Sequence, residues 1–293
     1  MIWLIGNRGM LGTDVARLLK ERKLDYVGSD LELDIIDLDS LRGYASGKAI
    51  GWIINCAAYT DVDKAEEERD KAFSINADGV LNISQLALEI DARLIHISTD
   101  YVFDGKKREA YTESDQPNPQ NAYGRSKLKG ERNIEQTMSN YFILRTAWLY
   151  GMHGHNFVHT MLRLFNERDR VQVVSDQWGG PTYTKDLAQA ILTIIDKDSS
   201  EYGVYHVTNE GRTNWYEFAK AIYAGAVACD LIKREVEILP INSKDYPTKT
   251  ARPQSSYLSK EKFKSTYGSS LSTWQEGLEA FLNEIIHTQG ASQ

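Results

Sequence analysis

The chain has 293 residues, of which 42% are hydrophobic and 26% are charged, enough for one large domain or two coupled ones. Its formal net charge of −7 argues against nucleic-acid binding by bulk electrostatics. Two cysteines are too few for a disulfide framework, no charged leader precedes the first apolar run, and no apolar stretch is long enough to span a bilayer. We therefore expect a cytoplasmic protein with neither a membrane nor a nucleic-acid partner.

The first elements predict a dinucleotide-binding unit. Residues 1–5 have the pattern of a buried strand, and residues 10–22 have the pattern of an amphipathic helix. Gly6, Gly9 and Gly12 lie at this junction, where glycines permit a tight turn and the helix N-terminus offers amides to a pyrophosphate. The spacing differs from the more familiar Gly-x-Gly-x-x-Gly, so glycines that merely close a turn are the alternative interpretation.

A second predicted strand, residues 25–29, ends at Asp30. A carboxylate at this place can accept hydrogen bonds from the ribose diol of an adenosine, and it repels a 2′-phosphate. The sequence therefore favours NADH over NADPH. Arg8, inside the glycine loop, could instead meet a phosphate, so both cofactors stay open.

Strand and helix patterns continue to alternate along the first half of the chain. Further strands are predicted near residues 51–55, 94–98 and 141–145, with helices near residues 63–90 and 122–137. Repeated β-α units with apolar strands predict an α/β fold with a doubly wound, Rossmann-like parallel sheet. Ligands of such sheets lie at the carboxyl ends of the strands.

Tyr123 and Lys127 lie four positions apart in the predicted helix 122–137, so their side chains share one face. Ketone reduction takes a hydride to carbon and a proton to oxygen. A neutral tyrosine can supply that proton if its pKa, normally about 10, is lowered, and a neighbouring ammonium lowers it. Thr99 ends a predicted strand at the same sheet edge. The alternative is that Tyr-x-x-x-Lys is an ordinary helix pair.

After Gly151 the alternation weakens. Helices are predicted near residues 184–196, 214–225 and 274–286, with a strand at residues 204–207. Three histidines gather before and within a predicted helix, but no acidic or thiol side chains keep zinc-ligand spacing with them. We therefore expect solvated or hydrogen-bonding roles for His153, His155 and His159.

Seven segments together resemble one family. The chain is similar to the extended short-chain dehydrogenase/reductases, and within them to the dTDP-4-dehydrorhamnose reductases, nearly from end to end. The segments that carry the resemblance are residues 6–12, 55–66, 98–105, 123–127, 144–151, 176–182 and 251–253.

The resemblance implies site residues. Catalysis would fall to Thr99, Tyr123 and Lys127, with Thr99 holding the substrate carbonyl and Lys127 also binding the nicotinamide ribose. Asp100 and Trp148 would contact the sugar. Cofactor contacts would come from the glycine loop and neighbouring strand ends, at Gly6, Gly9, Met10, Leu11, Gly12, Asp30, Asp34, Ile35, Ala57, Ala58, Thr60, Tyr123 and Lys127.

The resemblance also implies a division of the chain. Residues 1–150 would bind the dinucleotide, and residues 151–293 would form a smaller α+β lobe that binds substrate, with a discontinuous boundary because segments within residues 170–210 return to the sheet. Some family members form dimers bridged by magnesium. The matching position here is Lys185, which cannot ligate a cation, so we predict no essential metal and either a monomer or a homodimer.

The implied reaction is reduction of the 4-keto group of dTDP-4-dehydrorhamnose to dTDP-L-rhamnose by NADH or NADPH. Arg252 is a candidate for the nucleotide phosphates, although an exposed surface arginine is an equal alternative. Related 4,6-dehydratases carry a glutamate where this chain has Tyr101, which favours simple reduction. Another nucleotide-sugar reductase or epimerase, and a non-catalytic regulatory subunit like that of methionine adenosyltransferase, remain as alternatives.

Overall fold

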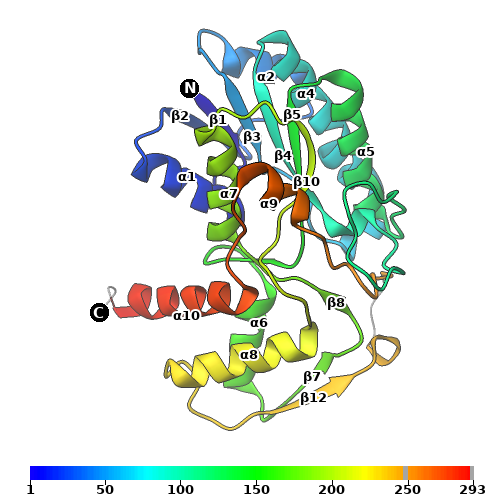
Figure 1. Ribbon diagram of the computed structural model, residues 1–293, viewed down its shortest axis with the longest axis vertical. Coiled ribbons are helices and arrows are strands. Elements are labelled where there is room, and N and C mark those ends of the chain that lie inside the picture. Colours follow the sequence, from blue (N-terminus) through cyan, green and yellow to red (C-terminus); the bar gives the residue numbers. More distant parts are fainter. Residues whose placement is uncertain (247–249, 291–293) are drawn as a thin grey trace.

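A six-stranded sheet forms the centre of the larger part of the molecule (Figure 1). The protein is described by a computed structural model over residues 1–246 and 250–290. All paired strands of the sheet are parallel, in the order β10-β5-β4-β3-β1-β2. The strands are β1 (Ile2–Ile5), β2 (Tyr26–Ser29), β3 (Trp52–Asn55), β4 (Arg93–Thr99), β5 (Tyr141–Thr146) and β10 (Gly203–His206).

Helices cover both faces of this sheet, which confirms the predicted doubly wound α/β fold. The cause is visible in β1, whose successive apolar residues alternate between two cores. Leu4 joins the core under α1 (Met10–Glu21) and α7 (Thr184–Asp196). Trp3 joins the opposite core. The helices of that second face are α2 (Leu38–Ala45), α4 (Gly79–Glu89) and α5 (Ala122–Thr137).

The helix predicted over residues 63–90 is present over residues 69–89, but it is not regular. The segment contains η1 (Lys64–Glu66), α3 (Arg69–Phe73), the π-helix η2 (Ser74–Asp78) and then α4. Asn76 lies in the π-helix, where its side-chain amide accepts from the backbone N–H of Tyr59 at 2.9 Å and donates to the Tyr59 carbonyl at 3.0 Å. The widened turn therefore ties this helix to the loop after β3.

A second group of elements forms the lower part of Figure 1. Its apolar core joins α6 (Phe157–Glu167), α8 (Trp215–Ala228) and α10 (Trp274–Gly290) to the strand β7 (Arg170–Val174). β7 pairs in parallel with β12 (Glu237–Ile241). Short two-stranded ladders, β6 (Leu149–Tyr150) with β9 (Thr182–Tyr183) and β8 (Trp178–Gly179) with β11 (Thr213–Asn214), lie along the connections.

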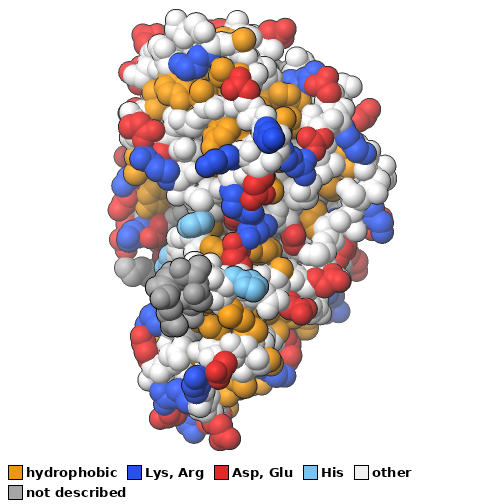
Figure 2. Space-filling view, turned by 90° about the vertical axis from the view of Figure 1, so that its left-hand side faces the viewer, with side chains coloured by type: hydrophobic (Ala, Val, Ile, Leu, Met, Phe, Trp, Pro, Cys, Tyr) orange, Lys and Arg blue, Asp and Glu red, His pale blue; other side chains and the backbone are white. Residues whose placement is uncertain are grey.

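The chain crosses between the two groups more than once. It leaves the sheet after β5, builds α6 and β7, and comes back through α7 and β10 before α8 begins. A short helix, α9 (Glu261–Tyr267), then packs on β10. Within the described residues no helix is both long and apolar enough to cross a membrane. Figure 2 shows acidic and basic side chains interspersed over one face of the molecule.

Candidate active site

The glycine loop is folded so tightly that two of its positions admit only glycine. Gly6 has a φ of +77°, a conformation that side chains disfavour. A Cβ on Gly12 would lie 1.9 Å from the carbonyl oxygen of Gly6. The loop therefore closes on the first turn of α1. Gly9 caps that helix without a side chain, so the first N–H groups stay open to a ligand.

A cavity of about 460 Å³ lies beside this loop, at the ends of β1, β2 and β3. Most of the cofactor contacts implied by the resemblance line it. The lining residues among them are Gly6, Gly9, Asp30, Asp34, Ile35, Ala57 and Ala58. Gly12 is instead packed beneath the loop, where its role is to let the backbone approach. This arrangement fits a dinucleotide, since the two glycines let the loop backbone pack tightly and the start of α1 has no side-chain cap.

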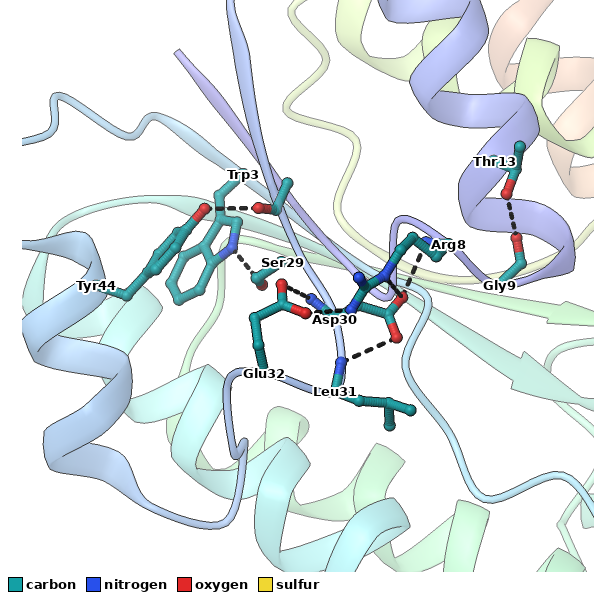
Figure 3. Close-up of polar contacts among 10 residues, drawn as sticks. Trp3, Arg8, Gly9, Thr13, Ser29, Asp30, Leu31, Glu32 and Tyr44 are labelled. Atoms are coloured by element: carbon teal, nitrogen blue, oxygen red, sulfur yellow. Dashed lines mark hydrogen bonds and ion pairs between the residues drawn. The ribbon is translucent and has the colours of Figure 1, made fainter.

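The charged groups at the far end of this cavity form a small network (Figure 3). Asp30 accepts from the backbone N–H groups of Arg8 and Leu31, each at 2.9 Å. Glu32 accepts from the backbone N–H of Asp30 at 2.8 Å and pairs with the guanidinium of Arg8. Arg8 is 65% exposed, so its head group lies at the surface between two carboxylates. Glu32 was missed by the sequence reasoning, because only the fold brings it beside the glycine loop.

A second cavity, of about 430 Å³, shares Gly9, Cys56 and Ala58 with the first and extends along the ends of β4 and β5. Thr99, Tyr123 and Lys127 all line it, so the three residues proposed for catalysis face one space. It also takes in the remaining predicted residues of the loop and strand ends, together with the predicted sugar contacts. These are Met10, Leu11, Thr60, Asp100 and Trp148.

The helix that carries Tyr123 lies unusually close to the turn after β4. Asn121 caps α5 by accepting from the N–H of Gly124 at 2.8 Å. A Cβ on Gly124 would lie 2.2 Å from the carbonyl oxygen of Tyr101. Glycine at this position therefore lets α5 rest on the short 3-10 turn η3 (Asp100–Val102), which brings Tyr123 to the end of the strand bearing Thr99.

The expected lowering of the Tyr123 pKa was wrong for this structure. Burial raises the pKa of Tyr123 to about 12, and a hydrogen bond with Thr99 opposes the rise. Lys127, only 2% exposed, directs its Nζ to the carbonyl oxygen of Ile97 at 2.6 Å. Burial lowers the pKa of Lys127 to about 8. The phenol is thus neutral, which is the protonation state that a proton donor needs.

Asp100 and Trp148 line the same cavity as the three proposed catalytic residues. Burial raises the pKa of Asp100 to about 6, against the opposing hydrogen bonds of Ser256 and Thr99. Trp148 has a φ of +47° and stacks on Trp215 with ring centroids 3.5 Å apart. An aromatic ring and a carboxyl group therefore line the same cavity, a combination that suits a sugar ring.

Other predicted residues lie apart from this cavity or have different surroundings. Arg252 does not line it, and its guanidinium pairs with Asp63 at 3.3 Å. His155 does line it, a placement that the sequence reasoning missed because the loop after β6 has no regular pattern. Lys185 pairs with Glu284. In the described residues no three or more His, Cys, Asp and Glu side chains are grouped to hold a metal ion.

The chain is similar to known proteins over most of its length. Residues 1–287 match the model of the RmlD substrate binding domain. The dTDP-4-dehydrorhamnose reductase of Aggregatibacter actinomycetemcomitans is 40% identical over 282 residues, which cover 94% of this chain and 96% of the relative. A dTDP-4-keto-6-deoxy-D-glucose reductase of Streptomyces niveus is 41% identical over 224 residues, covering 75% of this chain and 77% of the relative.

A solved structure is also similar over almost the whole chain. The dTDP-4-dehydrorhamnose reductase of Bacillus anthracis, crystallised in complex with NADP, has a TM-score of 0.91 and 39% sequence identity. The likeness covers 97% of this chain and 98% of that one. The chain therefore belongs to the RmlD substrate binding domain family.

Proposed function

We propose that this protein is an NAD(P)H-dependent dTDP-4-dehydrorhamnose reductase. It would reduce the 4-keto group of the dTDP-sugar and release dTDP-L-rhamnose. One observation carries the proposal: Thr99, Tyr123 and Lys127 face a single cavity that continues into the glycine loop. The names of the relatives, 40% and 39% identical, support the same reaction.

The residues divide the work as follows. When bound, the dihydronicotinamide supplies the hydride to C4 and becomes the oxidised cofactor. Tyr123 donates its phenolic proton to the carbonyl oxygen, so that ketone becomes alcohol and the phenol becomes phenolate. Thr99 donates a hydrogen bond to the same oxygen and stabilises the charge that develops there. Lys127, when protonated, stabilises the phenolate.

Substrate recognition is proposed for the groups around this centre. Asp100, which is 2% exposed, would accept hydrogen bonds from the sugar hydroxyls, and Trp148 would pack against the ring. We retain Arg252 as a candidate for the nucleotide phosphates. Its Nε is buried with no hydrogen-bond partner among the described residues. The ion pair with Asp63 would have to loosen for that contact.

Both nicotinamide cofactors are proposed to bind, with NADH favoured. Asp30 and Glu32 place two carboxylates beside the single guanidinium of Arg8. A 2′-phosphate must therefore compete with Glu32 for Arg8, whereas a ribose diol needs only the carboxylate of Asp30. The NADP bound in the Bacillus anthracis relative supports the view that NADPH is accepted too.

We also propose that the two parts of the chain have separate tasks. The large sheet would hold the dinucleotide, and the lobe built on α6, α8 and β7 would hold the sugar nucleotide. The lining of the second cavity supports this division, because it runs from Gly9 to Trp148 and His155.

The proposal is tested by mixing the purified protein with dTDP-6-deoxy-L-lyxo-4-hexulose and following the absorbance of NADH or NADPH. We expect consumption of either cofactor and formation of dTDP-L-rhamnose. If the protein reduced only dTDP-4-keto-6-deoxy-D-glucose, its substrate would be a different keto sugar from the one proposed. Binding of cofactor with no turnover of either sugar would favour a regulatory subunit.

A further inference from the structure

A buried chain of polar groups runs behind the proposed active site, from the cofactor loop to Lys127. The backbone N–H of Ala57 donates to Asn55 Oδ1 at 3.0 Å. Asn55 Nδ2 lies 3.0 Å from His96 Nδ1, and His96 Nε2 lies 3.2 Å from Lys127 Nζ. Asn55, His96 and Lys127 are exposed by 1%, 0% and 2%. These groups therefore satisfy one another inside the protein.

The donors and acceptors along this chain can be assigned in order. Because Asn55 Oδ1 receives the N–H of Ala57, its amide nitrogen must face His96, and that nitrogen only donates. His96 Nδ1 is consequently the acceptor. Burial and the charge of Lys127 lower the pKa of His96 well below its usual value, so the imidazole is neutral and has one proton. That proton is on Nε2, where it points at Lys127.

This assignment creates a conflict for a charged lysine. An ammonium has three donors and no acceptor, so it cannot accept the Nε2–H of His96. An uncharged amine has a lone pair that can accept this hydrogen bond. Rotating the Asn55 amide would reverse the imidazole, but it would set an NH₂ group against the N–H of Ala57 at 3.0 Å. The backbone of the cofactor loop thus fixes the orientation of the whole chain.

Resting on the proposed reductase function, we propose that His96 is a positioning residue: held with its proton on Nε2, it disfavours the ammonium form of Lys127 and makes this lysine a stronger acid. The lysine can then lose its charge at mildly alkaline pH instead of remaining a fixed cation. Burial by itself lowers the pKa of Lys127 to about 8, and the N–H of His96 would act in the same direction.

The other ionisable groups around Lys127 act differently. Glu131, one turn along α5, raises the Lys127 pKa, but its carboxylate is paired with Arg145 from β5 at 2.7 Å. Cys56, after β3, has its own pKa raised to about 12 by burial and stays a neutral thiol. Tyr123, one turn earlier on α5, is a neutral phenol. His96 is therefore the one group from β4 that turns an N–H toward the lysine.

The first experiment reads the tautomer directly. In protein labelled with ¹⁵N-histidine, long-range proton–nitrogen correlations distinguish the two neutral tautomers, and His96→Gln identifies the signals. We expect His96 to be neutral near pH 7, with its proton on Nε2. A proton on Nδ1, or a doubly protonated ring, would overturn the proposal. No substrate is needed, so an inactive protein would leave this result unaffected.

The second experiment follows the lysine. The Lys127 Cε signal, assigned by its loss in Lys127→Met, is titrated by carbon NMR in wild-type protein and in His96→Gln. Glutamine can present an amide oxygen to the ammonium, so the midpoint should rise by about one pH unit. His206→Gln is the matched control, because His206 is equally buried but contacts the carbonyl of Tyr111. An unchanged or lower midpoint in His96→Gln would refute the role.

Discussion

The substitution Gly124→Ala tests whether the close approach of α5 to the turn after β4 is needed to position Tyr123. In Gly124→Ala the new Cβ would lie 2.2 Å from the carbonyl oxygen of Tyr101 and 3.0 Å from Pro119 Cβ. Both neighbours are rigid, since one is backbone and the other a proline ring. The start of α5 must therefore move by about 1 Å to restore ordinary contacts, and Tyr123 moves with it.

The size of the effect follows from this displacement. Overpacking of this kind costs about 1–3 kcal/mol in the free energy of unfolding. A misplacement of about 1 Å at a reacting group can cost roughly 100-fold in rate. We expect Gly124→Ala to lower kcat by about two orders of magnitude. The KM for the cofactor should change much less, because no residue of α5 lines the cavity beside Asp30.

The assay is steady-state turnover together with urea unfolding. The control is Gly43→Ala, in the exposed face of α2, where a Cβ meets nothing within 4 Å. That change should leave kcat unchanged and stabilise the protein by up to about 1 kcal/mol. Wild-type kcat in Gly124→Ala would refute the argument that this close approach positions Tyr123.

Three further predictions concern charge. Glu32→Gln frees Arg8 from a competing carboxylate, so the ratio of kcat/KM for NADPH to that for NADH should rise about three- to tenfold; an unchanged ratio contradicts this arrangement. The raised pKa of Asp100 means that the native state holds this proton more tightly, so the group costs stability as pH rises from about 4 to about 6. Asp100→Asn should therefore stabilise the protein by up to about 3 kcal/mol at about pH 7.5 but not at about pH 4, measured by urea unfolding, and an equal effect at both would refute the assignment. Glu131→Gln leaves the buried Arg145 without its countercharge and should lower the free energy of unfolding by about 3–5 kcal/mol. Glu131→Leu combined with Arg145→Met should recover much of this loss. A loss below about 1 kcal/mol in the single variant would contradict the view that the buried arginine depends on this ion pair.

The local parts of this structure were predictable from the sequence. The helix with Tyr123 begins and ends where predicted, because Asn121 caps it and its apolar spacing is regular. The glycine loop has the strand-turn-helix context that its spacing indicates. In these elements the interacting residues lie close together in the sequence, so the local sequence is enough to predict them.

What the sequence could not reveal depends on contacts between distant residues. The π-helix at residues 74–78 arises because Asn76 reaches back to Tyr59, and nothing in the apolar pattern marks it. In the sequence, His96 is a single polar residue in an apolar strand, and only the fold brings Asn55 and Lys127 into contact with it. The expectation of a lowered pKa for Tyr123 was wrong for the same reason, because the burial that raises this pKa depends on the whole fold.

The central claim is that hydride reaches C4 of a keto sugar in the cavity that Tyr123 faces. It is tested most directly with NADH deuterated at the transferable C4 position of the nicotinamide and dTDP-6-deoxy-L-lyxo-4-hexulose. We predict a dTDP-L-rhamnose product that bears one deuterium at C4, formed by the wild-type protein and nearly abolished in Tyr123→Phe. Deuterium at another carbon, or undiminished turnover in Tyr123→Phe, would contradict the account.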